Sequence, residues 1–325
     1  MINFWKGKKV FITGCNGFIG SWLTYELFKQ GADVTGLIRD QITRTNLQLL
    51  KLEKKINIVH GDVTDFNCLR RCLAEYDIDT VFHLAAQPIV TVALKDPIGT
   101  FKANIEGTWN ILEVSRLLNV QRLIIASSDK AYGTHDQLPY DETFPLKGQF
   151  PYDVSKTCSD LIAQTYFNTY ELPLCITRNA NIYGGGDLNF NRIIPETIKN
   201  ILSNKDPVIR SSGEFIREFF YVKDAVMSYL LVAENLHRKD VVGRAFNFGS
   251  AQNLKIIDLV NLIIEISGKT KLKPIILDKV KKEITDQYLS SKLAESVLNW
   301  SPDYTLKEGL KETYKWYEAY FSTNM

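Results

Sequence analysis

Short apolar runs rich in β-branched residues alternate with longer amphipathic segments over the first half of the chain. The runs predict strands at 8–13, 33–38, 56–59, 80–84, 123–126 and 174–177. The segments between them predict helices that end at residue 30 or cover 47–52, 65–76, 97–118 and 154–170. Strands that alternate with helices in this order form a parallel sheet with helices on both faces. We therefore expect an α/β fold with a doubly wound parallel sheet.

The pattern changes after Tyr183, where Gly184-Gly185-Gly186 interrupts the chain. Beyond this point short elements follow one another without a repeat, which is typical of a second and smaller lobe. A predicted helix at 225–235 and a predicted strand at 245–248 would return to the first domain. We expect a first domain over 1–182, with a return segment near 222–250, and a C-terminal lobe over most of 183–325.

Composition removes several classes of function. The chain has 325 residues, 45% of them hydrophobic and 23% charged, with a formal net charge of +2. This balance predicts no nucleic-acid partner, and no apolar run approaches the roughly 18 residues of a membrane span. The N-terminus lacks the apolar core of a signal peptide, and the four histidines are too scattered to predict a metal site. The cysteines form no CxxC pair, so we expect buried free thiols in a cytoplasmic protein: Cys15, Cys68, Cys72, Cys158 and Cys175.

Three glycines follow the first predicted strand, in the pattern Gly14-x-x-Gly17-x-x-Gly20, where the first long helix begins. Small residues here let the backbone approach a pyrophosphate, and the N-terminus of the helix supplies N–H groups that bind it. A tight turn without a ligand is the alternative. The strand–turn–helix context favours a Rossmann-type sheet that binds a dinucleotide.

The ends of the next two strands offer further cofactor contacts. A Rossmann sheet normally has an acid for the ribose at the end of its second strand, where this chain has Arg39 followed by Asp40. Arg39 would suit a 2′-phosphate and would stack on adenine, or it is an exposed charge at a strand end. Asp62 would hydrogen-bond adenine, or it caps a turn.

The stretch from Ser127 to Lys156 collects groups that can transfer protons. Ser128-Asp129-Lys130 directly follows a predicted strand, and Tyr152-x-x-x-Lys156 lies at the start of the next long helix. Positions four apart share one face of a helix, so Lys156 would lie beneath Tyr152 and lower the pKa of its phenol. A phenolate is a general base at neutral pH. The stretch predicts an enzyme, although a Tyr-x-x-x-Lys pair by itself is often a coincidence.

Together these motifs resemble the extended short-chain dehydrogenase/reductase family over about residues 1–250. The family pattern is present in order as Thr13-Gly14-x-x-Gly17-Phe18-Ile19-Gly20, Asp62-Val63, His83-Leu84-Ala85-Ala86, Asn104-x-x-Gly107-Thr108, Ser127-Ser128, Tyr152-x-x-x-Lys156 and Asn181-x-Tyr183-Gly184. The resemblance implies NADP or NAD as cofactor, with NADP preferred because an arginine at position 39 is similar to NADP-using members. It implies cofactor contacts from Gly14, Asn16, Gly17, Phe18, Ile19, Gly20, Arg39, Asp62, Val63, Leu84, Ala85, Ala86, Asn104, Tyr152 and Lys156.

Within this family the chain resembles the nucleotide-sugar 4,6-dehydratases, whose acid and base directly follow the active-site Ser or Thr. Lys130 after Asp129 is similar to UDP-N-acetylglucosamine 4,6-dehydratases, whereas dTDP-glucose dehydratases generally carry Glu there. We therefore expect UDP-N-acetylglucosamine as the substrate. Four other stretches are similar to CDP-glucose 4,6-dehydratases, namely Phe4-Trp5-Lys6-Gly7-Lys8, Ala85-Ala86-Gln87-Pro88, Gly184-Gly185-Gly186-Asp187 and Arg192-Ile193-Ile194-Pro195.

Several alternatives remain open. CDP-glucose dehydratases usually have Lys where this chain has Ile19. Substrates other than UDP-N-acetylglucosamine are CDP-glucose and dTDP-glucose, and other activities are sugar epimerisation or release of a 5,6-alkene. A nicotinamide-sensing regulator would have lost the Tyr/Lys pair or the acid–base pair, and both are intact.

The resemblance implies a closed redox cycle on the sugar. Tyr152 takes the C4 hydroxyl proton as hydride leaves C4 for the nicotinamide, Ser128 hydrogen-bonds the oxygen, and Lys156 holds Tyr152. Lys130 then removes the C5 proton and Asp129 protonates the departing C6 hydroxyl, after which hydride returns to C6. For these roles Lys130 must be neutral and Asp129 protonated, and burial favours both states.

The same resemblance implies substrate contacts from Gln87, Ser128, Asn181, Arg192 and Arg217. The two arginines suit a pyrophosphate, because a guanidinium binds phosphate oxygens in pairs. Where many relatives carry a phosphate-binding Arg late in the chain, this sequence reads Asp286-Gln287-Tyr288.

Relatives also pair two helices across a two-fold axis. The corresponding helices of this chain carry apolar stripes, although a single stripe is more often part of the core. We expect a homo-oligomer, a dimer or larger. The stripes consist of Ile98, Phe101, Ile105, Trp109 and Leu112 on one helix, and of Val154, Cys158, Leu161 and Thr165 on the other.

Overall fold

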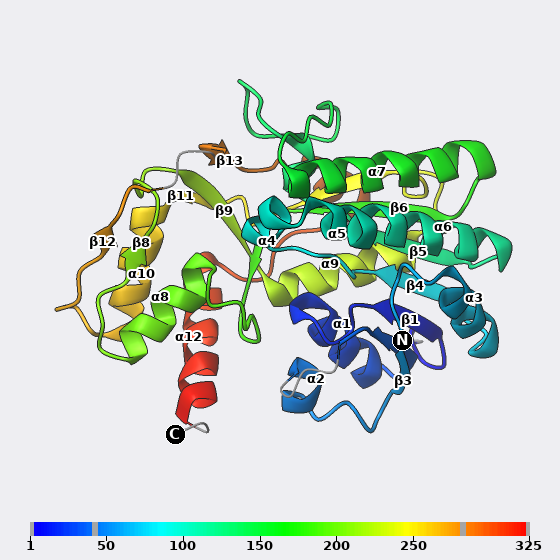
Figure 1. Cartoon of the computed structure of the whole chain (residues 1–325), viewed down its shortest axis with the longest axis horizontal. Coiled ribbons are helices and arrows are strands. Elements are labelled where there is room, and N and C mark those ends of the chain that lie inside the picture. Colours follow the sequence, from blue (N-terminus) through cyan, green and yellow to red (C-terminus); the bar gives the residue numbers. More distant parts are fainter. Residues whose placement is uncertain (1–2, 41–44, 280–283, 323–325) are drawn as a thin grey trace.

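A computed structural model describes residues 3–40, 45–279 and 284–322 of the chain. Its centre is a parallel sheet of seven strands (Figure 1). These strands are β1 (Lys9–Thr13), β2 (Asp33–Ile38), β3 (Asn57–His60), β4 (Thr80–His83), β5 (Arg122–Ala126), β6 (Leu174–Asn179) and β10 (Ala245–Phe248). Their order across the sheet is β10-β6-β5-β4-β1-β2-β3. This order is that of a Rossmann-type doubly wound sheet, which confirms the predicted fold class.

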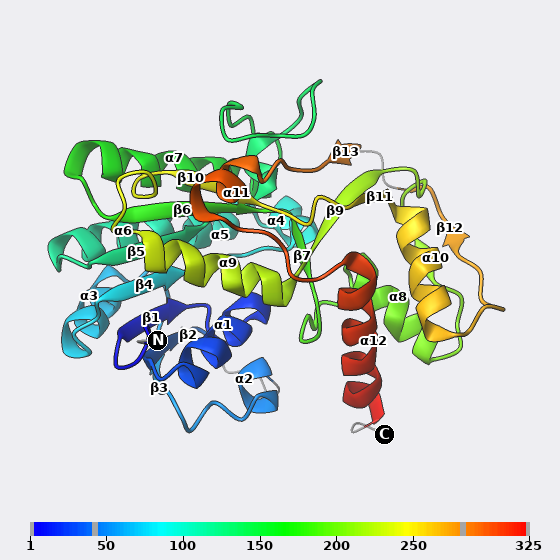
Figure 2. The same cartoon turned by 180° about the vertical axis from the view of Figure 1, so that it is seen from behind.

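Helices cover both faces of the sheet, as Figures 1 and 2 show from opposite sides. Along β1, Val10 and Ile12 belong to the core on one face, whereas Phe11 belongs to the core on the other. Successive side chains of a strand point to opposite faces, so strands buried on both sides read as continuous apolar runs. The first face is covered by α1 (Phe18–Lys29), α9 (Val222–Asn235) and α11 (Lys292–Leu298), and the second by α3 (Phe66–Glu75), α6 (Gly107–Leu117) and α7 (Pro151–Tyr170).

The segment before α6 differs from the single regular helix predicted at 97–118. It consists of α5 (Pro97–Phe101), a π-helical turn at Lys102–Glu106 and then α6. The short helix α4 (Val90–Lys95) precedes it and was not predicted. The helix predicted at 47–52 corresponds to the short helix α2 (Asn46–Leu49), which lies near α1. The π-helical turn contains Asn104, which is buried and hydrogen-bonded to a neighbouring loop and to α7. Single π-helical turns of this kind occur often beside functional sites.

The smaller lobe is built around β9 (Ile216–Tyr221), a strand of which all but the first residue is buried. This strand pairs with β7 (Asn181–Tyr183), β11 (Asn253–Lys255) and β13 (Asp286–Gln287). An apolar core joins them to α8 (Ile193–Leu202), α10 (Ile256–Ser267) and α12 (Leu306–Ser322), and a further pair is β8 (Val208–Ile209) with β12 (Ile275–Ile276). After β9 the chain returns to the large sheet, where β10 pairs with β6.

The five cysteines are free, as predicted. Cys15, Cys72 and Cys175 are buried, whereas Cys68 and Cys158 are partly exposed, so the prediction that all five are buried was wrong for these two. Both lie on helices that cover the sheet, α3 and α7, whose outer sides face solvent. Within the described segments, no helix combines the length and apolar character needed to cross a bilayer.

Candidate active site

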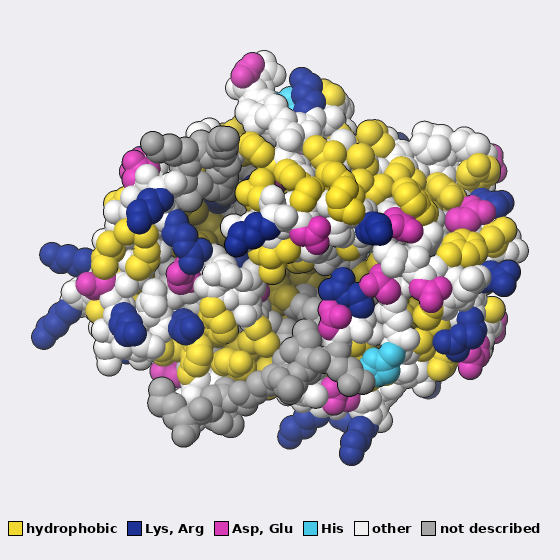
Figure 3. Space-filling model, viewed as in Figure 1, with side chains coloured by type: hydrophobic (Ala, Val, Ile, Leu, Met, Phe, Trp, Pro, Cys, Tyr) yellow, Lys and Arg dark blue, Asp and Glu magenta, His cyan; other side chains and the backbone are white. Residues whose placement is uncertain are grey.

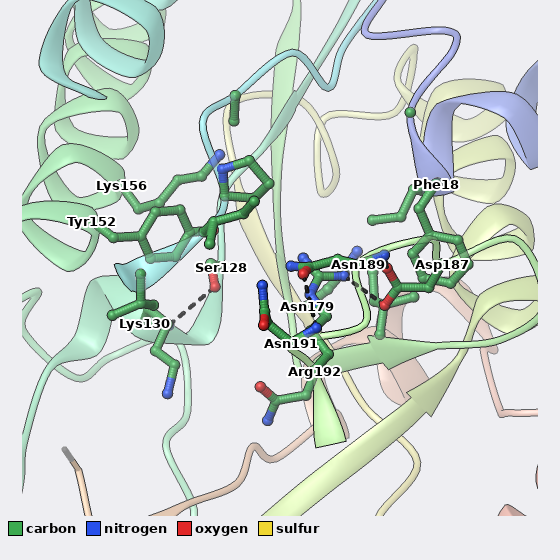
Figure 4. A pocket seen from close by; sticks show the side chains of 18 of the residues that line it. Phe18, Ser128, Lys130, Tyr152, Lys156, Asn179, Asp187, Asn189, Asn191 and Arg192 are labelled. Atoms are coloured by element: carbon green, nitrogen blue, oxygen red, sulfur yellow. Dashed lines mark hydrogen bonds and ion pairs between the residues drawn. The ribbon is translucent and has the colours of Figure 1, made fainter. Parts of the chain in front are cut away.

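A cleft of about 1310 Å³ lies where the carboxyl ends of the sheet strands face the smaller lobe. The loops after β1 through β6 all contribute to its wall, which is the usual ligand position in a doubly wound sheet. Figure 4 shows Tyr152, Lys156 and Ser128 on one side and Asn189, Asn191 and Arg192 on the other. The predicted site residues that line the cleft are Gly14, Asn16, Gly17, Phe18, Ile19, Gly20, Arg39, Asp62, Val63, Leu84, Ala85, Ala86, Ser128, Asp129, Lys130, Tyr152, Lys156, Asn181, Arg192 and Arg217.

The glycine loop has the shape that a dinucleotide pyrophosphate requires. Gly14 has φ +72°, and a Cβ at Gly20 would lie 2.1 Å from the carbonyl oxygen of Gly14. Only glycine fits these two positions without displacing the backbone. The first turn of α1 has neither a side-chain cap nor an acidic residue. Its N–H groups and the positive end of its dipole therefore suit an anionic group, and the loop fits a nicotinamide dinucleotide.

Arg39 and Asp62 line the same end of the cleft but already have partners. The guanidinium of Arg39 donates to Asp40 at 2.9 and 2.7 Å and lies 3.9 Å from Asp62. Asp62 accepts hydrogen bonds from the backbone N–H and the hydroxyl of Thr64. It therefore caps a turn, which is one of the two roles predicted for it. Its second carboxylate oxygen faces Arg39. The Arg39 side chain is 60% exposed, so a ligand can reach it.

Tyr152 and Lys156 lie side by side at the start of α7, yet their electrostatics differ from the prediction. The ammonium group of Lys156 donates to the backbone carbonyl of Ala126, at the end of β5, at 2.7 Å. Burial lowers the pKa of Lys156 to about 8, while the carboxylate of Asp160 opposes this change. Burial raises the pKa of the Tyr152 phenol above its usual value, and Arg192 opposes this rise. The predicted lowering of the Tyr152 pKa by Lys156 is therefore wrong for this state, because desolvation dominates.

A short helical turn, Asp129–Tyr132, follows directly after β5, and Ser128 is its N-cap residue. The turn therefore contains Asp129 and Lys130. The hydroxyl of Ser128 accepts from the backbone N–H of Lys130 and donates to the carboxylate of Asp129 at 3.0 Å. Asp129 is 2% exposed, and its other carboxylate oxygen has no hydrogen-bond partner among the described residues. Burial raises the pKa of Asp129, the direction expected of a general acid. The amine of Lys130 donates to the side-chain oxygen of Gln287 in β13.

Gln87 and Asn104 lie behind the wall of the cleft rather than on it. The side-chain oxygen of Asn104 accepts from the backbone N–H of Gln87 at 2.7 Å, and its nitrogen donates to Ser155 at 2.8 Å. The side chain of Gln87 folds back onto the backbone of Ile89. Together they tie the loop after β4 to α7. The polar atoms of both side chains are used within the protein, so direct contact with cofactor or substrate stays a prediction for these two residues.

The predicted phosphate-binding residues are placed differently from one another. Arg192 points into the cleft and pairs with the buried carboxylate of Asp187 at 3.0 Å (Figure 4). The side-chain nitrogen of Asn181 donates to the backbone carbonyl of Glu218 at 3.1 Å. Arg217 is 5% exposed, and its guanidinium donates to the backbone carbonyls of Ile216, Ile284 and Thr285. Arg217 therefore holds the chain beside β13, which is a structural role that the sequence did not predict.

Several residues of the smaller lobe that line the cleft were not predicted. Arg210 donates to the backbone carbonyl of Asn191 at 2.9 Å and to Glu196 at 2.7 Å, which holds its guanidinium at the rim. The polar run after the glycine break, with two Asn residues ahead of Arg192, is a signal that could have revealed part of this wall. Asn189, Asn191, Arg210 and Phe215 are among these residues.

The chain is similar to known proteins over nearly its whole length. Residues 11–313 match the model of a family described as GDP-mannose 4,6 dehydratase. CDP-glucose 4,6-dehydratase from Salmonella typhimurium is 32% identical over 98% of this chain and 92% of its own length.

Two solved structures are similar over nearly the whole chain. A UDP-glucose 4-epimerase from Thermotoga maritima, with UDP-glucose, has a TM-score of 0.89 at 26% identity over 96% of this chain and 99% of its own. A dTDP-glucose 4,6-dehydratase from Streptomyces venezuelae, with NAD bound, has a TM-score of 0.87 at 26% identity over 97% of this chain and 98% of its own. With a glycine loop shaped for a dinucleotide and Ser, Tyr and Lys side chains in one cleft, the chain belongs to the GDP-mannose 4,6 dehydratase family of extended short-chain dehydrogenase/reductases.

Proposed function

We propose that the chain is a nucleotide-sugar 4,6-dehydratase. The observation that carries this proposal is the acid–base pair Asp129–Lys130, which lies in the same cleft as Ser128, Tyr152 and Lys156. Oxidation of a sugar hydroxyl needs only the last three groups. A buried carboxyl group with a raised pKa and an adjacent amine are what loss of water requires in addition.

A nicotinamide dinucleotide held by the glycine loop would accept hydride from C4 of the sugar and return it to C6. Tyr152 takes the proton of the C4 hydroxyl, and Ser128 hydrogen-bonds the oxygen. The resulting C4 ketone acidifies the C5–H bond, whose proton passes to the neutral amine of Lys130. The electron pair of that bond then expels the C6 hydroxyl, which leaves as water with the proton of Asp129. Return of hydride to C6 would give an enolate, and Lys130 gives its proton back to C5.

Epimerisation at C4 is the second candidate, because a UDP-glucose 4-epimerase is among the similar structures. An epimerase needs the same redox residues but neither a C5 base nor an acid for a leaving hydroxyl. Asp129 and Lys130 therefore favour the dehydratase.

CDP-glucose is the first substrate to test, because the relative from Salmonella typhimurium acts on it by name and four stretches of the chain resemble such enzymes. UDP-N-acetylglucosamine, which rests on Lys130 alone, stays a prediction and is the second. The test incubates the protein with CDP-glucose, UDP-N-acetylglucosamine, dTDP-glucose and UDP-glucose, with NAD or NADP, and analyses the products by mass spectrometry and NMR. A 4-keto-6-deoxy sugar supports the proposal. A C4 epimer, or no conversion of any of them, contradicts it.

We also propose that NADP is preferred over NAD, with Arg39 on the 2′-phosphate. A charge-assisted hydrogen bond contributes about 1.5–3 kcal/mol, so Arg39→Ala should weaken NADP binding by about tenfold or more. NAD binding should change little. Calorimetric titration of both cofactors into parent and variant measures this, and Arg71→Ala, an exposed arginine on α3 away from the cleft, is the control. Equal losses for NAD and NADP would show that Arg39 has no role in choosing between them.

We further propose that two copies of the chain pair through α5, α6 and α7. Leu112 faces the core, but Ile98, Trp109 and Leu161 on these neighbouring helices are 64%, 44% and 49% exposed. Apolar side chains gather over this part of the surface in Figure 3. Exposed apolar surface of this kind is typical of an interface. Light scattering at micromolar concentration should give at least the mass of a dimer, and Ile98→Asp with Leu161→Asp should lower it. A monomer mass for the parent would refute the pairing.

A further inference from the structure

The residue that faces the amine of Lys130 comes from the far end of the chain. Lys130 donates to the side-chain oxygen of Gln287, which lies 157 positions later, in β13. Figure 4 shows the side chain of Lys130 extending away from the ring of Tyr152. Gln287 is fully buried, and the oxygen of its amide is a hydrogen-bond partner of that amine.

The backbone that carries Gln287 is held from several sides. Ile216 donates its N–H to the carboxylate of Asp286 at 3.1 Å, and Arg217 donates to the carbonyl of Thr285 at 2.6 Å. Gln287 itself is in register with Arg217 in the pairing of β13 with β9. Two residues later, the N–H of Leu289 donates to the buried carboxylate of Glu218 at 2.8 Å. The strand therefore presents the amide of Gln287 at a set position.

One half of the Gln287 amide is unused. Its nitrogen is buried and has no hydrogen-bond partner among the described residues. A primary amide has an acceptor oxygen and a donor nitrogen, which exchange places when the group rotates by about half a turn. The oxygen can accept from an ammonium, and the nitrogen can donate to the lone pair of a neutral amine. A carboxylate offers only the first of these contacts.

Several charged groups already lie around the Asp129–Lys130 pair. The positive charges of Lys130 and Arg217 oppose the rise in the pKa of Asp129. The negative charge of Asp129 contributes to the rise in the pKa of Glu218. Asp286, next to Gln287, adds another carboxylate on β13. A further anion at position 287 would stabilise the ammonium form of Lys130. The neutral amine, which acts as the base, would then be less populated.

We propose that Gln287 is a positioning residue that partners the amine of Lys130 in both its neutral and its protonated form. The inference rests on the proposed dehydratase function. In that reaction the C5–H bond breaks, its proton goes to the lone pair of Lys130 and its electrons move toward the C4 ketone, so both forms of the amine occur in each cycle. An amide at position 287 holds the side chain through this change without a change of its own charge.

The test uses the full chain with Gln287→Glu, Gln287→Leu and the neighbouring control Asp286→Asn. Under single-turnover conditions, Gln287→Leu should slow exchange of the C5 hydrogen with deuterated water by about 10²-fold, because the base is no longer aligned. Oxidation at C4, followed by the near-ultraviolet absorbance of reduced nicotinamide, should stay close to the parent. In Gln287→Glu the added carboxylate should raise the pKa of Lys130. The pH at which the exchange rate reaches half its maximum should therefore rise by about one to three units. Asp286→Asn keeps an acceptor for the N–H of Ile216 and removes one nearby charge, so it should change the pH profile of exchange far less than Gln287→Glu.

A second measurement needs no substrate. The Cε resonance of Lys130, assigned by its loss in Lys130→Ala, is titrated by ¹³C NMR in the parent and in Gln287→Glu. An upward shift of the pKa by about one to three units supports the inference, and equal titration curves overturn it whatever sugar the protein uses. If the parent exchanges C5 hydrogen and Gln287→Leu exchanges it equally fast, the role of Gln287 fails but the dehydratase stands. If the parent converts no sugar nucleotide, the function fails, and the titration still decides the contact.

Discussion

Replacing Asp129 with Asn and Lys130 with Ala should abolish the 4-keto-6-deoxy product while oxidation at C4 remains possible. Ser128, Tyr152 and Lys156 are unchanged in this variant. The C5 proton then has no base and the C6 hydroxyl has no acid, so the reaction stops before the alkene forms. Loss of a positioned acid or base costs about 10²–10⁴-fold, and the effect on product formation should be at least that large.

The stalled variant has a distinct signature. With substrate added, it should accumulate reduced nicotinamide, visible by its near-ultraviolet absorbance, or retain bound oxidised sugar. It should not exchange the C5 hydrogen with deuterated water. Tyr152→Phe is the matched control, because it removes the first base and should show no reduced cofactor at all. If the Asp129/Lys130 variant turns over nearly as fast as the parent, or still exchanges C5 hydrogen, these two residues are not the acid–base pair.

Loss of one partner of the buried ion pair Asp160–Arg178 should strongly destabilise the fold. The carboxylate of Asp160, on α7, accepts two hydrogen bonds of 2.9 Å from Arg178 on β6. The two side chains are 0% and 4% exposed, and Arg178 also donates to the hydroxyl of Tyr132 at 2.9 Å. Asp160→Ala leaves a buried guanidinium without its counter-charge. Such a change costs about 3–5 kcal/mol of unfolding free energy.

Urea unfolding, followed by circular dichroism, measures this loss. An apolar pair in the same place, Asp160→Leu with Arg178→Met, should recover most of the stability, because no buried charge is left unpaired. Asp240→Ala removes the exposed carboxylate that pairs with Arg238 and should leave the unfolding midpoint nearly unchanged. A similar midpoint for Asp160→Ala and the parent would show that Arg178 finds another counter-charge or water.

The sequence alone was sufficient for features that depend on neighbouring residues. Side-chain periodicity located the strands of the large sheet to within a residue or two, including β2 at the predicted boundaries and β10 as the returning strand. The glycine loop was predictable because its conformation is set within a few residues of Gly14. Ser128, Asp129 and Lys130 were found for the same reason, since they sit together directly after β5.

The tertiary structure decided the contacts between segments distant along the chain. Lys156 bonds to the carbonyl of Ala126 on another element, and burial then governs the pKa of Tyr152. Arg217 turns to backbone carbonyls near β13, and the pairing of β13 with β9 brings Gln287 to Lys130. The periodicity of one segment states which of its faces is buried, but not against which partner or at what register. For this protein, local pattern therefore determined which chemical groups are available, and packing determined which of them meet and how they are charged.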